Sequence, residues 1–193
     1  MLYNAATDGR YDTYWGDSFY MEYFDILDKH ANPIGLVAEK GTPLGEGMYY
    51  MGVNGYIVTP EGYFLLQQRA YYKKIRPGCW DILMGHVMAG ESSKETIIRE
   101  TQEEIGLIIE EHNLDFIQRF LWEDAQIIID IYFIITSIDL KALVLQEDEV
   151  IKTKLISKEE IITFIQEMTY HTQLYRNLIL NAIEHICLNI EKF

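Results

Sequence analysis

Runs of apolar, β-branched and aromatic residues recur along the chain, and turn-forming residues separate them. Residues 41–47 are rich in glycine, and the Pro-Glu-Gly sequence at 60–62 interrupts two apolar runs, so both segments predict connections between strands. The strands expected from this pattern, in chain order, cover residues 21–28, 34–40, 48–59, 63–69, 80–87, 115–122, 126–136 and 150–156.

Three other segments carry helix signals. Ser92 and Glu95 form a capping-box pair, and Gly106 is placed for a left-handed C-terminal cap, which predicts a helix between them. A second capping box at Ser157 predicts a helix that ends at about Met168. The last twenty or so residues predict an amphipathic helix whose apolar positions cover the core, with a homodimer interface as the alternative. Those positions are Leu174, Leu178, Ala182, Ile183, Ile186 and Ile190.

The order of these elements predicts an α/β domain in which a mixed sheet lies between helical layers. A chain of 193 residues suits one domain. We expect residues 22–193 to form this domain, and residues 1–21 to be an aromatic-rich extension that packs on the domain or on a partner subunit. The aromatic residues of the extension are Tyr3, Tyr11, Tyr14, Trp15, Phe19 and Tyr20.

Composition narrows the class of function. The formal net charge of −14 argues against nucleic acid or an anionic membrane as a partner. No signal-peptide pattern opens the chain, and the apolar run 127–135 contains Asp130 and is too short to span a bilayer. The two cysteines, Cys79 and Cys187, do not predict a disulfide framework, and a cytoplasmic location fits them.

The helix predicted at 92–106 carries Glu100, Glu103 and Glu104 on one face, because residues three and four apart are neighbours on a helix. The apolar arc beside them consists of Ile97, Ile98, Thr101 and Ile105. A solvated acidic face is the ordinary interpretation of such a helix, but like charges one turn apart cost about 0.2–0.5 kcal/mol. Carboxylates that converge beside a core instead predict a hard divalent cation, Mg²⁺, with Mn²⁺ as a substitute.

Residues 85–107, GHVMAGESSKETIIRETQEEIGL, resemble the Nudix box, the signature of the Nudix hydrolase family. The residues that carry the resemblance are Gly85, Glu91, Arg99, Glu100, Glu103, Glu104, Gly106 and Leu107. The resemblance implies an α/β/α sandwich and hydrolysis of a diphosphate linkage. Thr101 departs from the pattern, which has an aliphatic residue there; its hydroxyl can bond back to a helix carbonyl, so we expect a small effect on stability and intact chemistry.

Roles follow for the residues of the box. Glu100, Glu103 and Glu104 are the expected metal ligands, and the resemblance suggests that the Gly85 carbonyl completes the metal sphere. Glu103 or Glu104 could also serve as general base.

Further roles surround the ligands. Arg99 is expected to orient the carboxylates, and Glu91 to anchor the loop or to join the outer shell of the metal. Glu147 and Glu149, in an acidic loop, are the alternative base; for either residue alone, a solvated turn is the slightly favoured interpretation.

A basic loop precedes the box. Arg69, Lys73, Lys74 and Arg76 lie within eight positions, and Tyr72 is interleaved with them. We expect the loop to clamp the diphosphate while an aromatic ring stacks on the rest of a small-molecule substrate. The alternative is a solvated loop with half-buried tyrosines.

Residues 22–160 also resemble the Nudix branch related to isopentenyl diphosphate isomerase. In that enzyme a catalytic cysteine precedes the Gly-His that corresponds to Gly85 and His86, whereas this chain has Met84 there and a complete box. We therefore predict an Mg²⁺-dependent pyrophosphohydrolase that acts on a nucleoside diphosphate derivative or a related compound. An isomerase and a non-catalytic module that senses a nucleotide are the alternatives.

Overall fold

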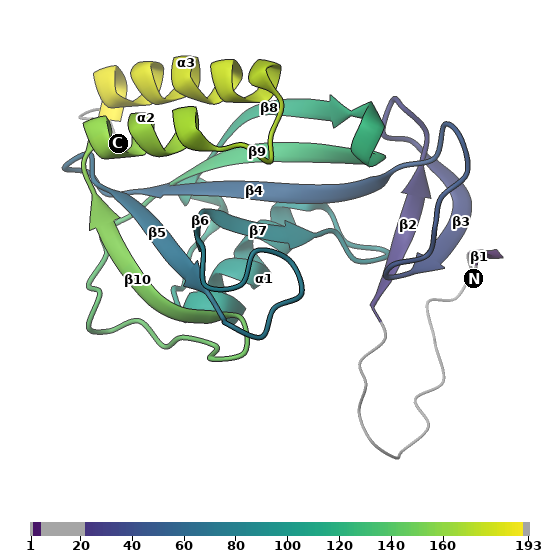
Figure 1. The fold of residues 1–193 in the computed structure, drawn as a ribbon, viewed down its shortest axis with the longest axis horizontal. Helices are drawn as coiled ribbons and strands as arrows, with labels where there is room; N and C mark the ends of the chain where they lie inside the picture. Colours follow the sequence, from purple (N-terminus) through teal and green to yellow (C-terminus); the bar gives the residue numbers. More distant parts are fainter. Residues whose placement is uncertain (1, 5–21, 191–193) are drawn as a thin grey trace.

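The computed structural model describes residues 2–4 and 22–190 (Figure 1). A seven-stranded sheet forms the centre of the molecule, with the strand order β10-β5-β4-β9-β8 and with β6 paired to β5 and β7 paired to β4. Its strands are β4 (Tyr50–Val58), β5 (Phe64–Arg69), β6 (Trp80–Asp81), β7 (Leu83–His86), β8 (Leu114–Trp122), β9 (Ile127–Ile135) and β10 (Val150–Ile156). The pair β4–β9 is parallel and the other pairs are antiparallel, so the sheet is mixed, as predicted.

Helices cover the two faces of this sheet (Figure 1). Helix α1 (Ser93–Ile105) lies on one face, and α2 (Lys158–Glu167) with α3 (Gln173–Asn189) lie on the other. Strand β9 is buried on both faces, because Phe133 packs in the core under α2 and α3 whereas Ile134 packs in the core under α1. The predicted α/β architecture with helical layers on both faces is confirmed.

A second sheet has the order β1-β3-β2. Its strands are β1 (Leu2–Asn4), β2 (Tyr23–Leu27) and β3 (Pro33–Glu39). The hairpin predicted between residues 21 and 40 is therefore confirmed, but it belongs to this smaller sheet. Apart from β1, the predicted N-terminal extension lies outside the described residues.

The single strand predicted at 80–87 is wrong. This segment forms two short strands, in which Asp81 pairs with Gln67 of β5 and Gly85 pairs with Val53 of β4. Strands β4 and β5 pair with each other at Val58 and Phe64, next to the turn that joins them. Farther from this turn, β5 pairs with β6 and β4 pairs with β7. The chain therefore passes from one partner strand to the other at Ile82, which no local pattern indicates.

The other predicted elements match the structure to within one to three residues at their ends. Short 3₁₀ turns at Glu111–Asn113 and Glu123–Ala125 precede β8 and β9. The core of the same chain buries Ile183 and Ile186 of α3 and the C-cap residue Ile190, whereas Leu174 is 70% exposed. The terminal helix is thus core cover, and a homodimer stays a prediction. Within the described residues, no helix is long and apolar enough to cross a bilayer.

Candidate active site

The capping residues fix the two ends of α1. Ser92 Oγ accepts a hydrogen bond from the backbone N–H of Glu95, and the Glu95 carboxylate accepts one from the backbone N–H of Ser92 at 2.8 Å. Gly106 ends the helix with φ 69°, and a side chain there would meet the backbone of Val144 at 2.9 Å. The Thr101 hydroxyl donates to the carbonyl of Ile97 at 2.6 Å, as expected. The box therefore folds as the predicted helix.

Glu100 and Glu104 lie on the side of α1 that faces the sheet. A Cβ atom at Gly85 would lie 2.4 Å from Cγ of Glu100 and 2.6 Å from its Oε1, so a glycine is required for Glu100 to lie against β7. Glu104 is 7% exposed, and its Oε2 accepts a hydrogen bond of 2.5 Å from Nε2 of Gln67 on β5. Two glutamates thus pack between a helix and a sheet, where apolar side chains are the ordinary occupants.

Burial changes the acidity of both groups. It raises the pKa of Glu100 to about 7, against the opposing effect of the Arg99 guanidinium. It raises the pKa of Glu104 to about 8, and the negative charges of Glu100 and Glu149 act in the same direction. Because the charged forms are penalised by the site itself, a positive charge that comes near them would be bound favourably.

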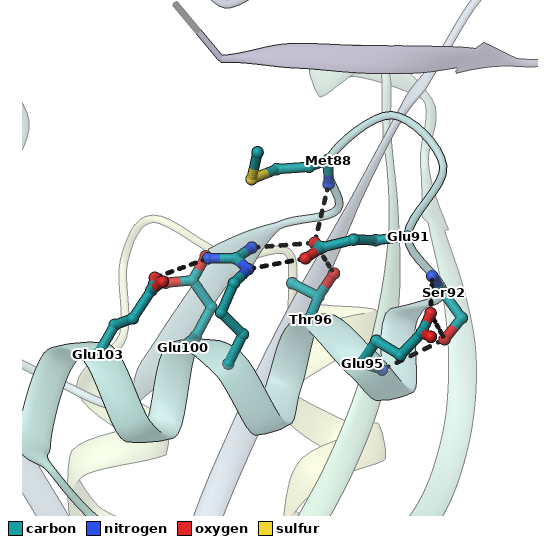
Figure 2. A network of polar contacts seen from close by, with 8 residues as sticks. Met88, Glu91, Ser92, Glu95, Thr96, Glu100 and Glu103 are labelled. Atoms are coloured by element: carbon teal, nitrogen blue, oxygen red, sulfur yellow. Dashed lines mark hydrogen bonds and ion pairs between the residues drawn. The ribbon is translucent and has the colours of Figure 1, made fainter. Parts of the chain in front are cut away.

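Arg99 joins the loop before the helix to the carboxylates of the helix (Figure 2). Its Nε and Nη2 donate to the two carboxylate oxygens of Glu91 at 2.8 and 3.1 Å. Its Nη1 donates to Oε1 of Glu100 at 3.0 Å and to Oε2 of Glu103 at 2.8 Å. Figure 2 shows Glu91, Glu100 and Glu103 turned toward one another around this guanidinium. The i, i+4 spacing of Arg99 and Glu103 thus appears as an ion pair, and Arg99 also pairs with Glu91 and Glu100.

Glu91 ties the loop to the first turns of α1. Its Oε2 accepts hydrogen bonds from the Thr96 hydroxyl at 2.8 Å and from the backbone N–H of Met88 at 3.4 Å. Burial alone would raise the pKa of Glu91, but the hydrogen bonds from Arg99 and Thr96 leave it below its ordinary value. Glu91 is therefore a charged anchor rather than a free acid.

Glu103 is the most exposed of the three glutamates of the motif. Its side chain is 52% exposed and pairs with Arg99. A groove of about 760 Å³ along this side of α1 is lined by Gly90, Glu91, Glu95, Ile98, Arg99, Gln102 and Glu103. In the described part of the chain, no three His, Cys, Asp or Glu side chains form a group that could hold a metal ion. The predicted three-glutamate site is thus divided, with Glu100 and Glu104 toward the sheet and Glu103 toward the groove.

The predicted alternative bases lie in a loop that docks on the end of α1. The backbone N–H of Gln146 donates to the carbonyl of Glu104 at 3.0 Å. The carboxylate of Glu149 forms an ion pair with Lys73 and contributes to the raised pKa of Glu104. Glu147 is exposed, and its backbone carbonyl accepts a hydrogen bond of 2.7 Å from the Tyr72 hydroxyl. Glu149 is therefore the member of this loop that is electrostatically coupled to the box.

The basic residues of the loop at 69–76 point to different parts of the structure. The charge of Arg69 lowers the pKa of Glu104, and Lys73 pairs with Glu149, so these two residues lie on the side of the carboxylates. Arg76 instead donates to Asp81 at 2.6 Å, and its guanidinium lies 3.3 Å from the ring centre of Tyr170, between α2 and α3. The structure therefore does not bring Arg76 to the box.

The exposed part of the basic loop consists of Lys74 and two tyrosines. Tyr71 is 69% exposed and Tyr72 is 68% exposed, so they are more accessible than the half-buried rings expected of a plain solvated loop. Lys74 is exposed, and these three side chains are accessible to a ligand in solution.

Sequence reasoning missed two polar clusters near α1. Gln67 donates a hydrogen bond to Glu104. The amide side chain in the otherwise apolar strand sequence FLLQQR is the sequence feature that could have indicated this contact. Asp130, 1% exposed on β9, accepts hydrogen bonds from Arg119 at 2.7 and 2.8 Å and from the Ser93 hydroxyl at 2.6 Å. Asp130 interrupts an apolar run, which is a signal that a buried charge has a partner.

Comparisons with known proteins identify the family of the chain. The family model described as NUDIX domain matches residues 48–178. An uncharacterized Nudix hydrolase of Listeria monocytogenes is 29% identical over 142 residues, which make up 73% of this chain and 83% of that protein. An isopentenyl-diphosphate Delta-isomerase of Citrobacter koseri is 28% identical over 89 residues, or 46% of this chain and 49% of the isomerase.

The fold is also that of solved structures. A crystal structure of a Deinococcus radiodurans protein matches with a TM-score of 0.61 at 17% identity, and the match covers 76% of this chain and 90% of that one. The family model spans more than half of the chain and includes the whole box, α1 and the central sheet from β4 to β10. The chain therefore belongs to the Nudix family and is a hydrolase that acts on pyrophosphate bonds.

Proposed function

We propose that this hydrolase depends on a divalent cation, Mg²⁺ with Mn²⁺ as a substitute, and cleaves the diphosphate linkage of a nucleoside diphosphate derivative or a related small molecule. The observation that carries the proposal is the pair Glu100 and Glu104. Glu104 is buried and Glu100 is partly buried, both have raised pKa values, and the negative charge of Glu100 adds to the raised pKa of Glu104 one helical turn away. A divalent cation would neutralise both charges at once.

The residues present fit such a cation. Carboxylates and carbonyl oxygens are the ligands that Mg²⁺ prefers, and Gly85 supplies a backbone beside Glu100 with no side chain in the way. The amide oxygen of Gln67, buried beside Glu104, has no hydrogen-bond partner among the described residues. Glu100, Glu104, the Gly85 carbonyl and Glu103 would hold the cation, and Glu103 would exchange its ion pair with Arg99 for this role.

The bound cation would neutralise phosphate oxygens and lower the pKa of a water molecule. Arg99 and Glu91 keep the carboxylates of α1 in place through their shared ion pairs. Glu103 and Glu149 are the candidate general bases, because Glu103 reaches solvent at the groove and Glu149 lies close enough to Glu104 to raise its pKa. Arg69, Lys73 and Lys74 would attract the phosphates, and Tyr72 would contact the remainder of the substrate. Arg76 could join them only by leaving Asp81.

An isomerase is the second candidate, because an isopentenyl-diphosphate Delta-isomerase is among the relatives. The residue before Gly85 is Met84, so the cysteine that the resemblance implies for isomerisation is missing at that position. Cys79 is exposed and five residues earlier, at the end of the basic loop. Hydrolysis is therefore the better supported reaction.

The test is release of the two phosphate-containing products from each member of a panel of diphosphate compounds, separated by chromatography, with Mg²⁺ and with EDTA. We expect release only with the cation, and a fall in kcat of about 100-fold or more for Glu104→Gln. Glu103→Gln and Glu149→Gln, assayed over a pH range, assign the base, since the base variant loses the acidic limb of the profile. Glu167→Gln, an exposed glutamate on α2, is the matched control. Full rates in both the Glu103 and the Glu104 variants would exclude the proposal.

The same panel tests the isomerase alternative. Isopentenyl diphosphate is included, and its double-bond position is followed by proton NMR. We expect no migration of the double bond. Migration without phosphate release would favour the second candidate.

A further inference from the structure

Gln67 has a polar side chain at a buried position of the central sheet. It lies on β5 and is 4% exposed, and its backbone is held on both sides, by Asp81 of β6 and by Thr153 of β10. Leu65, two residues earlier on the same face, packs in the apolar core under α1. An apolar residue at position 67 would continue this surface.

The two polar atoms of the amide have different surroundings. Nε2 donates to Oε2 of Glu104 at 2.5 Å. Oε1 is buried, and within the described residues nothing donates a hydrogen bond to it. A buried acceptor without a partner destabilises the folded state, so the amide at position 67 is unfavourable for the fold taken alone.

The geometry of the amide links its oxygen to Glu104. An amide is planar, so once Nε2 is held by Glu104, the direction of Oε1 is fixed beside the same carboxylate. An N–H donor favours the ionised carboxylate, which is the form that coordinates a cation. A water molecule in the shell of a cation on Glu104 has hydrogens to donate, and Oε1 is an acceptor without a donor.

We propose that Gln67 is a positioning residue of the active site: its N–H orients Glu104, and its Oε1 accepts a hydrogen bond from a water molecule of the cation's coordination shell. This inference rests on the proposed function, because it requires a divalent cation on Glu104. It assigns a role to a residue outside the Nudix box, on a strand that the box helix packs against.

The experiment measures Mn²⁺ binding to the full chain by electron paramagnetic resonance of free Mn²⁺. Gln67→Met keeps the length of the side chain and removes both polar atoms, and Gln67→Leu is a second variant in case the first does not fold. We expect the Kd for Mn²⁺ to rise about 10- to 100-fold, as is typical when a partner of a metal ligand is lost. In EDTA, we expect the melting temperature to be unchanged or higher, because the unpartnered acceptor has been removed.

Gln68→Met is the matched control. Gln68 is the next residue on β5, and its Nε2 donates to the Gly78 carbonyl at 2.9 Å instead of contacting Glu104. We expect this variant to bind Mn²⁺ as the wild type does. Steady-state kinetics add a second readout: Gln67→Met lowers kcat and leaves the KM for the diphosphate substrate within about twofold, since the substrate contacts are untouched.

The outcomes separate this inference from the proposed function. A wild-type protein that binds Mn²⁺ and a Gln67→Met variant that binds it equally well overturn the role of Gln67 alone. A lower melting temperature in EDTA with unchanged Mn²⁺ affinity shows a purely structural amide and also overturns it. If the wild-type protein binds no more Mn²⁺ than the Glu104→Gln variant does, the cation site itself is overturned, and the proposed function with it.

Discussion

Gly85 and Glu100 illustrate how the motif works at the scale of single residues. The motif residues could be picked out from the sequence because each has a fixed spacing, and their placement on α1 follows from helical geometry. The closeness of Gly85 to Glu100 could not be predicted in the same way, because it depends on how β7 packs against the helix. Gln67 was missed for the same reason, since its partner Glu104 is 37 residues away.

The contact at Gly85 makes a prediction for Gly85→Ala. The added Cβ would lie 2.4 Å from Cγ of Glu100, which must move because β7 is held in the sheet. A ligand displaced by about 1 Å can cost about 100-fold in rate, so we expect kcat for diphosphate hydrolysis to fall by that order. Gly45→Ala, where the nearest atom is the flexible Met48 sulfur at 3.3 Å, is the control. Full activity in Gly85→Ala would show that Glu100 does not need its present position.

At the scale of elements, helices were predicted closely and the strand at 80–87 was not. Helix ends carry local signals, and Ser92, Ser157 and Gly106 act as their patterns indicate. The change of partner at Ile82 depends on the divergence of β4 and β5, which are joined by pairing at Val58 and Phe64. A non-local pairing of this kind leaves no local sequence pattern.

His171, between α2 and α3, makes a pH prediction at this scale. Its ring stacks on Tyr175 with centroids 4.0 Å apart, and in the described structure neither ring nitrogen has a hydrogen-bond partner. Burial lowers the pKa of His171 to about 4 from its ordinary 6.5, and the charges of Arg76 and Arg176 add to this effect. As the pH falls, His171 is therefore protonated in the unfolded chain before it is protonated in the folded one. The stability of the folded state is unaffected by His171 above pH 6.5 and decreases as the pH falls from 6.5 toward 4.

The measurement is urea unfolding of wild type and of His171→Phe at pH 7.5 and at pH 4.5. Between pH 7.5 and pH 4.5, we expect the free energy of unfolding to fall by roughly 2 to 3 kcal/mol less in the variant than in the wild type. Phenylalanine keeps the stacking and cannot be protonated. An equal response of both proteins to pH would show that His171 is not held in its neutral form.

At the scale of the whole molecule, the fold class followed from the order of elements, but the strand order did not. Nothing in the sequence indicates that β4 pairs in parallel with β9. In this pairing Tyr50, the first residue of β4, lies opposite Ile127, the first residue of β9, which is 77 residues later in the chain. Strand β9 presents apolar side chains on both faces of the sheet, to the core under α1 on one face and to the core under α2 and α3 on the other. The charge of −14, by contrast, is readable from composition alone.

This charge predicts how salt affects catalysis. A diphosphate is an anion, and two of the four basic residues of the loop at 69–76 are already paired, Lys73 with Glu149 and Arg76 with Asp81. The field of the whole molecule should therefore oppose association, and salt screens it. We expect kcat/KM to rise roughly two- to threefold between 20 and 200 mM KCl at saturating Mg²⁺. A fall over this range would show that the basic loop dominates the approach of the substrate.

The most direct measurement of the cation site is a crystal structure of the wild-type protein grown with Mn²⁺, with anomalous data collected to locate the ion. We predict a peak about 2.1 Å from carboxylate oxygens of both Glu100 and Glu104, with the Gly85 carbonyl in the same sphere. Glu103 should then have turned from Arg99 toward the ion. No peak between α1 and β7, with Glu103 still paired with Arg99, would contradict a metal-dependent hydrolase built on these glutamates.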